Sequence, residues 1–343
     1  MRVRDFGCTL YGKERRIRFG IIGVGGYIAA RHLKAMYEVG GELVCALDVN
    51  DSVGVLEMYF PEAEFFTRES AFVAFASNLL ARAEGLDFIS VCTPNFLHKR
   101  HIMLALKLAS NVICEKPIVL DMRAFASLYK LEYGIPYRTE SKAFQNLMSD
   151  SDKIESKKPR IFGILQLRLH QEIINLKRRI QDDLIDNPAK YYKLKLHYIT
   201  ARGKWYFASW KGDERKSGGI ICNIGVHLFD MLIFVFGRAQ SNVLLESSAH
   251  RASGVLYFAN AEIVWLLSVD SKDLPTGSHK ALRTLESSDG SGEIYFDFSQ
   301  GFEDLHTKSY EEIIQNRGFG LDEVYECIKL MTYIRGQESK RSC

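Results

Sequence analysis

The sequence predicts two domains, an N-terminal doubly wound parallel sheet followed by a C-terminal α/β domain with a large, mainly antiparallel sheet. Three observations support this prediction. The length of 343 residues is that of two domains. Between residues 17 and 131, short β-branched runs alternate with helical patterns, as they do in βαβ units. After residue 190, apolar and polar residues alternate within short runs, which is typical of half-buried antiparallel strands.

The first domain is expected at residues 1–168, with residues 1–16 as an extension. Its strands are short, unbroken apolar runs, and such runs must be covered on both faces. The predicted strands are residues 18–22, 43–47, 64–66, 88–92, 112–114 and 161–165. Apolar residues at helical spacing predict helices at residues 29–39, 68–83 and 97–108. The polar segment 136–159 is interpreted as a surface insertion.

The second domain is expected at residues 169–343. It opens with a helical run at residues 170–180, and an apolar helix is predicted at residues 226–236. Alternating patterns predict strands at residues 191–198, 243–246, 254–258, 262–269 and 293–298. A basic aromatic segment, residues 202–216, precedes the apolar helix.

Composition excludes several classes of function. A net charge of +3 argues against a broad nucleic-acid-binding or membrane-surface field. The seven cysteines form no C-x-x-C pair or zinc ladder, so we expect free thiols, a reducing compartment and no metal site. Cys45, Cys92 and Cys114 lie in apolar strand-like runs and are expected in the core. No apolar stretch has signal-peptide or membrane-span length, which favours a cytoplasmic protein without a membrane partner.

A glycine-rich turn joins the first strand to the first helix. Glycines there let the backbone approach a pyrophosphate, and the helix N-terminus offers free N–H groups. The turn departs from G-x-G-x-x-G because the third small residue is Ala29 instead of Ile28, so we expect a turn one residue longer. By itself the pattern also fits an ordinary tight βα turn. The turn comprises Gly23, Val24, Gly25, Gly26, Tyr27, Ile28 and Ala29.

Asp48 follows the second predicted strand. A carboxylate at this point typically accepts hydrogen bonds from the adenosine ribose and repels a 2′-phosphate, which favours NAD over NADP. The alternative is that Asp48 is a turn or cap residue.

Two further motifs lie at the ends of predicted parallel strands, where open α/β sheets bind their ligands. One is Thr93-Pro94-Asn95 with His98, and the other is Glu115-Lys116-Pro117. Partial desolvation at the sheet end and a neighbouring cationic cofactor would lower the pKa of a lysine, which favours a role in proton transfer. The alternative for Lys116 is a solvated loop residue.

The second domain carries two candidate motifs. Residues 202–216 hold five basic and two acidic residues among aromatic rings, which suits an anionic ligand with a ring, although a solvated charged face has the same composition. His227 and Asp230 are three residues apart, on one face of the predicted apolar helix, after a glycine-rich turn. The carboxylate could orient the imidazole; the alternative is a core histidine.

These motifs together resemble the glucose-fructose oxidoreductase and inositol dehydrogenase family (Gfo/Idh/MocA). Its marks are the glycine turn, the E-K-P at residues 115–117 and the G-G-x-x-x-[DN]-x-G-x-H-x-x-D run ending at Asp230. Segments 164–171, 198–206, 209–216, 223–227, 266–270, 273–275, 304–307 and 309–312 are similar to the family's UDP-N-acetylglucosaminuronate 3-dehydrogenases. The resemblance covers residues 17 to about 335.

The resemblance implies an N-terminal Rossmann domain and NAD-dependent oxidation of carbon 3 of a UDP-linked N-acetylated glucuronate, on a path to diamino sugars of surface polysaccharides. In some members 2-oxoglutarate reoxidises the NADH, and such proteins form homodimers or homotetramers. The implied catalytic residues are Lys116 and His227. The implied cofactor residues are Gly23, Gly25, Gly26, Tyr27, Ile28, Asp48, Asn50, Thr93, Pro94, Asn95, His98, Glu115 and Lys116. The implied substrate residues are Gln166, Arg168, Lys211, Arg215, Asn223 and His227.

Hydride loss from an alcohol requires removal of the hydroxyl proton, so a base must reach that oxygen. We assign His227 as the base and Lys116 as a hydrogen-bond donor to the same oxygen; the alternative exchanges or shares the two roles. Arg168, Lys211 and Arg215 are assigned to the uronate carboxylate and diphosphate. Two competing functions stay open: a dehydrogenase of an uncharged sugar or polyol, and a non-catalytic NAD-binding regulator. A nucleic-acid-binding module is the least supported hypothesis, because the net charge is close to neutral.

Overall fold

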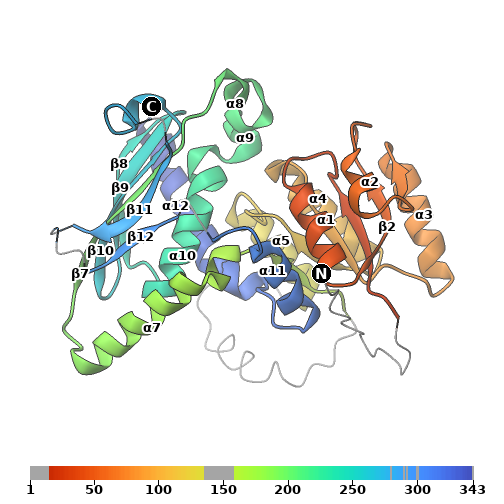
Figure 1. Cartoon of the computed structure of the whole chain (residues 1–343), viewed down its shortest axis with the longest axis horizontal. Helices are drawn as coiled ribbons and strands as arrows, with labels where there is room; N and C mark the ends of the chain where they lie inside the picture. The colour runs from red at the N-terminus through yellow and green to blue at the C-terminus, as the bar shows by residue number, and fades with distance from the viewer. Residues whose placement is uncertain are drawn as a thin grey trace. The chain divides into compact units, whose positions relative to one another are not determined.

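A computed structural model describes residues 15–134 and 158–341, apart from residues 279, 289, 291–292 and 299–300 (Figure 1). These residues form two compact units. The first contains residues 15–93, 97–115, 122–134 and 158–163, and the second contains residues 94–96, 116–121 and 164–341. The predicted boundary after residue 168 stays a prediction, and most of the predicted extension and of the polar insertion lies outside the described residues.

The first unit is a parallel six-stranded sheet in the order β3-β2-β1-β4-β5-β6. Its strands are β1 (Arg18–Ile22), β2 (Glu42–Leu47), β3 (Glu64–Phe66), β4 (Phe88–Val91), β5 (Asn111–Cys114) and β6 (Ile161–Gly163). Its helices are α1 (Ala29–Glu38), α2 (Val55–Tyr59), α3 (Glu69–Ala81), α4 (His98–Lys107) and α5 (Met122–Tyr133). The direction of winding reverses between β1 and β4, which makes their carboxyl ends the point where such sheets bind ligands.

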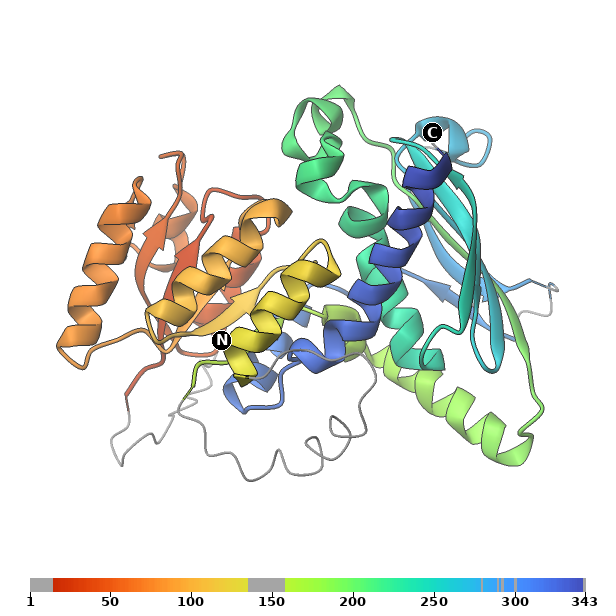
Figure 2. The ribbon, with the colours of Figure 1, turned by 180° about the vertical axis from the view of Figure 1, so that it is seen from behind.

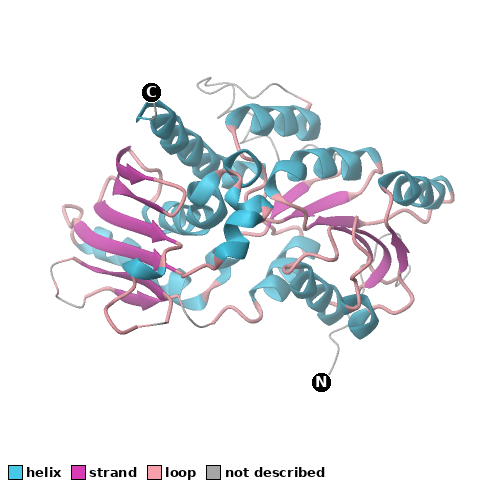
Figure 3. Cartoon of the chain, turned by 90° about the horizontal axis from the view of Figure 1, so that it is seen from above, coloured by secondary structure: helices cyan, strands magenta, loops and turns pink. Residues whose placement is uncertain are grey.

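Helices cover both faces of this first sheet (Figures 2 and 3). The central strands are mainly apolar because neither face meets water, and Phe19, Ile21, Ile89 and Ile113 are fully buried. The predicted core cysteines are buried and unpaired. Burial raises the pKa of Cys45 to about 12.

The second unit holds a six-stranded sheet in the order β12-β11-β7-β10-β9-β8. Its strands are β7 (Tyr192–Ile199), β8 (Ser241–Ser247), β9 (Arg251–Tyr257), β10 (Ala261–Ser268), β11 (Leu282–Ser287) and β12 (Tyr295–Asp297). The sheet is mixed: β7 and β10 pair in parallel, and every other neighbouring pair is antiparallel. The expectation of a mainly antiparallel sheet is confirmed, but antiparallel pairing does not extend to its centre.

Helices pack on one face of this second sheet (Figure 3). The helices of the second unit are α7 (Gln171–Asp186), α8 (Lys204–Ala208), α9 (Glu214–Ser217), α10 (Val226–Phe236), α11 (Leu305–Ile314) and α12 (Leu321–Arg341), of which α12 packs against β8. Alternation along the strands sends Leu194, Ile263 and Trp265 into the core, while Lys195 and Val264 point to the open face.

The helical stretch Glu214–Phe236 is long and apolar enough to span a membrane by composition alone. However, 72% of its apolar window is buried inside the protein, as is typical of a core helix. Its apolar character is therefore explained by its packing within the second unit.

Candidate active site

The glycine turn at the end of β1 is built for close backbone approach. Gly23 has φ +92°, and a Cβ there would lie 2.8 Å from the backbone of Cys92 and Thr93. The Gly26 amide donates to the Gly23 carbonyl over 3.1 Å. Ala29 is the first residue of α1 and is fully buried, so the small residue falls one position later than in the standard motif, as predicted. Only glycine meets these constraints at position 23.

Asp48 lies directly after β2, beside this turn. Its Oδ2 accepts from the Gly25 amide over 2.9 Å, and its Oδ1 accepts from the Asn50 amide over 2.9 Å. Tyr27, in the glycine turn, and Asn50, two residues after Asp48, are both exposed. A carboxylate fixed beside a glycine turn that leads into a helix N-terminus fits a dinucleotide, with the ribose at Asp48 and the diphosphate at the turn.

The loop after β4 is held by two histidines of α4. The Thr93 hydroxyl lies 2.9 Å from His101 Nδ1, and the Thr93 carbonyl lies 2.7 Å from His98 Nε2. His98 is fully buried and anchors the loop, and the cofactor contact that the resemblance implied for it stays a prediction. Pro94 and Asn95 pack in the second unit, where Asn95 donates to the Ser217 carbonyl over 2.8 Å.

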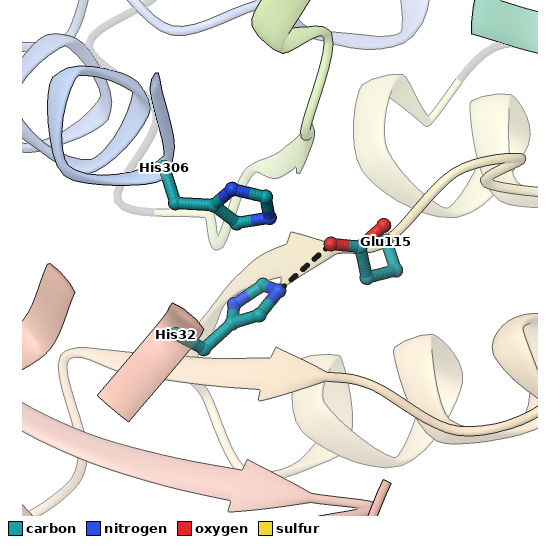
Figure 4. A group of neighbouring side chains, drawn as sticks. All are labelled: His32, Glu115 and His306. Carbon is teal, nitrogen blue, oxygen red and sulfur yellow. Dashed lines mark hydrogen bonds and ion pairs between the residues drawn. The ribbon is translucent and has the colours of Figure 1, made fainter. Parts of the chain in front are cut away.

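Glu115 ends the β5 segment of the first unit and is buried against α1. One of its carboxylate oxygens lies 3.0 Å from Nε2 of His32, which is also buried (Figure 4). The contact joins the helix that follows the glycine turn to the end of β5. Glu115 therefore braces the first unit, a role that the sequence did not reveal.

Lys116 and His227 line the same small pocket, and both belong to the second unit. Asp230 and three apolar side chains complete its lining, from Leu165, Leu167 and Val226. Lys116 Nζ lies 3.4 Å from the Asn223 carbonyl oxygen, which accepts its hydrogen bond. The predicted amine and imidazole thus converge on one partly apolar space.

A π-helical turn, Ile221–Gly225, leads into α10 and places His227 in the first turn of that helix. Gly218 precedes it with φ +78°, and a Cβ there would lie 2.5 Å from Cys222. The Asn223 amide donates to the Tyr206 hydroxyl over 2.8 Å. Burial raises the pKa of Tyr206. Asn223 is thereby fixed by its side chain while its carbonyl holds Lys116.

Two family descriptions match the chain. "Oxidoreductase family, NAD-binding Rossmann fold" matches residues 17–133, and the C-terminal α/β domain of the same family matches residues 177–277. The chain belongs to the Gfo/Idh/MocA oxidoreductase family. Its first unit is accordingly an NAD-binding Rossmann domain, and the predicted fold class is confirmed.

Solved structures of two complexes are similar over nearly the whole length of this oxidoreductase. The WlbA (WbpB) dehydrogenase of Thermus thermophilus with NAD and alpha-ketoglutarate is 38% identical, with a TM-score of 0.79 over 93% of this chain and 94% of that one. Its complex with NAD and UDP-GlcNAcA has a TM-score of 0.78 at the same identity and coverage.

Among curated proteins, glucose-6-phosphate 3-dehydrogenase of Bacillus subtilis is 27% identical over 238 residues, which are 67% of this chain and 56% of that protein. The oxidoreductase thus spans little more than half the length of this relative.

A buried ion pair of this oxidoreductase supports the pocket. Arg168 donates to Asp230 through Nε over 2.9 Å and through Nη2 over 2.8 Å, and Nη2 also donates to the Glu323 carbonyl over 2.8 Å. The guanidinium lies over the rings of Phe234 and Phe319. Burial raises the pKa of Asp230, and the Arg168 charge opposes that shift. Arg168 therefore binds an anion, but the anion is a side chain of the chain itself.

The remaining predicted substrate residues of the oxidoreductase lie apart from this lining. Lys211 Nζ is 5.4 Å from the Trp205 ring and 5.8 Å from the Trp210 ring. Burial lowers the pKa of Lys211, and the charge of Arg202 adds to this effect. Arg215 is almost fully exposed and lies 3.4 Å from Asp213. In the described part of the chain, neither basic side chain lines the pocket of Lys116 and His227.

Gln166, also predicted to contact substrate, has a buried Oε1 for which the described residues offer no hydrogen-bond donor. Such an atom is costly to bury alone, so a ligand that donates to it would be favoured. The family resemblance alone pointed to Gln166, because a buried amide without a partner leaves no mark on spacing or composition.

Proposed function

We propose that this oxidoreductase uses NAD to oxidise the carbon 3 hydroxyl of UDP-N-acetylglucosaminuronate to a ketone. The observation that carries the proposal is the shared pocket of Lys116 and His227, because an alcohol oxidation needs a proton acceptor and an oxyanion stabiliser at one oxygen. The Thermus thermophilus complexes with NAD and UDP-GlcNAcA or alpha-ketoglutarate support the choice of substrate.

The cofactor site is assigned to the first unit. The glycine turn would hold the diphosphate, and Asp48 would accept hydrogen bonds from the adenosine ribose. Because Asp48 would repel a 2′-phosphate, we assign NAD in preference to NADP. When bound, NAD supplies the hydride acceptor.

The proton chemistry is assigned to the second unit. His227 would take the hydroxyl proton, and the Lys116 ammonium would donate to the same oxygen as negative charge develops on it. The apolar walls formed by Leu165, Leu167 and Val226 strengthen both interactions by excluding water. A positioned base contributes about 10² to 10⁴ in rate. The alternative in which lysine and histidine exchange roles uses the same two atoms.

The anionic parts of the substrate need cations and a ring. Lys211 lies against two tryptophan rings, and Trp205 is about half exposed, so this segment offers a charge and a stacking surface to a nucleotide. We assign Lys211 and Arg215 to the diphosphate and uronate carboxylate. Since Arg168 is already paired with Asp230, we reassign it as a positioning residue for the pocket.

The cellular role follows from the substrate. We propose that the protein acts in the cytoplasm, on the way to diamino sugars of surface polysaccharides, and that 2-oxoglutarate recycles its NADH. The open face of the second sheet carries Val243, Leu245 and Val264, and we propose that a homodimer or homotetramer covers it. Size-exclusion chromatography with light scattering tests the assembly.

One incubation tests the substrate and the recycling together. The protein is mixed with UDP-N-acetylglucosaminuronate and 2-oxoglutarate, and mass spectrometry follows the 3-keto sugar nucleotide and 2-hydroxyglutarate. Lys116→Met should lose turnover and keep NAD binding, whereas Lys308→Met, at an exposed position of α11, should behave as the parent protein. Normal turnover by Lys116→Met would remove the mechanism.

Competing substrates are separated by inhibition. UDP should compete with the substrate, because its diphosphate would occupy the basic aromatic segment, whereas an uncharged polyol site has no reason to bind it. A sugar phosphate, as named for the Bacillus subtilis relative, is tested as substrate in the same assay. NAD binding without reduction by any of these sugars would favour the non-catalytic regulator.

A further inference from the structure

The loop after β4 contains a hydroxyl at the point where the first sheet changes direction of winding. β4 pairs with β1, and the Cys92 amide donates to the Ile22 carbonyl over 2.8 Å. A Cβ on Gly23 would lie 2.9 Å from Thr93 Cγ2, so the Thr93 side chain packs against the glycine turn. Thr93 is therefore placed where a dinucleotide crosses from one half of the sheet to the other.

The Thr93 hydroxyl is the first of three polar groups in successive contact, followed by His101 and Glu69. Thr93 Oγ1 lies 2.9 Å from His101 Nδ1, and His101 Nε2 lies 3.6 Å from Glu69 on α3. The other oxygen of Glu69 accepts from Arg100 over 2.8 Å. The imidazole is buried, so its ring has little freedom to turn away from the hydroxyl.

The state of the imidazole decides what the hydroxyl can offer. With Nε2–H directed at Glu69, the neutral ring presents Nδ1 as an acceptor, and the Thr93 O–H donates to it. The Thr93 oxygen then keeps its lone pairs for a donor such as a ribose hydroxyl. A protonated ring would donate to that oxygen instead and leave the O–H pointing outward. One proton on His101 thus converts Thr93 from an acceptor into a donor.

We propose that His101 and Glu69 are positioning residues that fix the Thr93 hydroxyl as a hydrogen-bond acceptor for a hydroxyl or amide donor of the bound dinucleotide. The proposal rests on the NAD-binding role of the first domain and is independent of the sugar substrate. It also predicts that protonation of His101 weakens NAD binding, because the imidazolium then donates to the Thr93 oxygen and the Thr93 O–H is turned toward the donor of the dinucleotide.

Burial lowers the pKa of His101, and the Glu69 carboxylate opposes that effect. Arg100 and His98, both on α4, lower the pKa of His101 further. The neutral form is consequently the one present at neutral pH. His98 holds the Thr93 carbonyl, so it stays unchanged in every variant used to test the proposal.

The test measures NAD affinity by calorimetry from pH 7.5 down to the lowest pH at which the protein stays folded, because the pKa of His101 is lowered by burial. At pH 7.5, Thr93→Val and His101→Leu should each weaken NAD binding by about 3- to 10-fold, the usual range for one lost hydrogen bond. The double variant should be no weaker than Thr93→Val, because the imidazole acts through the hydroxyl. Thr93→Ser, which keeps the hydroxyl, should restore both the affinity and its pH dependence.

The pH profile separates positioning from packing. Affinity of the parent protein should fall as the pH is lowered through the pKa of His101, whereas affinity of Thr93→Val should follow a flatter curve. AMP serves as the control ligand because it reaches only the Asp48 half of the site, and its affinity should change less than 2-fold in all variants. Additive losses in the double variant, equal losses of AMP affinity, or identical pH curves would each overturn the proposal. None of these outcomes depends on turnover of a UDP-sugar.

Discussion

The buried pair of Arg168 and Asp230 allows a quantitative prediction. Arg168→Met keeps a long apolar stem between Phe234 and Phe319 but leaves the Asp230 carboxylate without its partner. Breaking a buried pair from one side typically costs about 3–5 kcal/mol, because the remaining charge stays out of water. For a unit of this size, that corresponds to a fall in Tm of about 10 °C.

The expected pH dependence has a definite sign. Burial already raises the pKa of Asp230, and removing Arg168 takes away the charge that opposes this rise. A carboxyl whose folded pKa lies above its unfolded value destabilises the fold increasingly as the pH rises through the folded pKa. The penalty of Arg168→Met should therefore be largest near pH 7.5 and shrink toward pH 4.5.

Tryptophan fluorescence provides the assay. All three tryptophans, Trp205, Trp210 and Trp265, belong to the second unit, so the signal reports unfolding of the unit that contains the pair. Guanidinium titrations at several pH values give the free energy of unfolding.

Two control variants decide the interpretation. Arg179→Met breaks the exposed pair with Glu293 and should cost about 1 kcal/mol or less. Replacing both buried partners, as Arg168→Met with Asp230→Leu, should recover most of the lost stability, since no charge is then left unpaired. The reasoning is refuted if Arg168→Met costs no more than Arg179→Met, or if its cost is the same at every pH.

Three further outcomes are expected. Asp48→Asn should weaken NAD binding about 3- to 10-fold, because it removes the charge beside the Gly25 amide. In equilibrium titrations it should also reduce the preference for NAD over NADP. An unchanged preference for NAD would contradict the assignment of Asp48 to the ribose. Tyr206→Phe should lower kcat several-fold with NAD affinity unchanged, since the Asn223 amide loses its hydrogen bond to the Tyr206 hydroxyl. Equal losses of kcat and of NAD affinity would indicate a general loss of folding. Cys45 and the other buried thiols should resist alkylation in the native protein and react after unfolding, as peptide mass spectrometry would show.

Local pattern was sufficient for most of the fold. The strands of the first sheet are mainly apolar runs, and their predicted bounds differ from the observed ones by at most two residues, the largest difference being at β6. In contrast, β11 was missed. Its adjacent residues Thr284 and Leu285 are both buried, so it lacks the alternation by which a half-buried strand is identified.

The long helix α12 was also missed, although its signal was present. Val324, Cys327, Ile328, Met331 and Ile334 are buried at spacings of three and four residues, as on one face of a helix. The parallel pairing of β7 with β10 had no such signal, because pairing between distant segments is decided by tertiary packing.

In the candidate site, too, local sequence pattern predicts some features, and tertiary packing decides the others. Residue types at strand ends and helix starts identified Asp48, Lys116 and His227 as candidates. The buried pairs that support the site could not be predicted, because their partners are remote in the chain. His32 and Glu115 are 83 residues apart, and Arg168 and Asp230 are 62 apart. A pairing of this kind depends on which buried groups meet after folding, and no local periodicity records it.

The E-K-P segment, residues 115–117, combines a local motif with contacts to residues remote in the chain. Glu115 is held within the first unit by His32, while the next residue, Lys116, packs in the second unit and donates to the Asn223 carbonyl. Because Lys116 follows Glu115 directly, it lies two residues after Cys114, the last residue of β5, at the edge where open parallel sheets typically bind ligands. The two charges of the motif thus have separate contacts: the carboxylate pairs with His32 in the first unit, and the amine contacts Asn223 in the second unit, to which the proposed function assigns the proton chemistry.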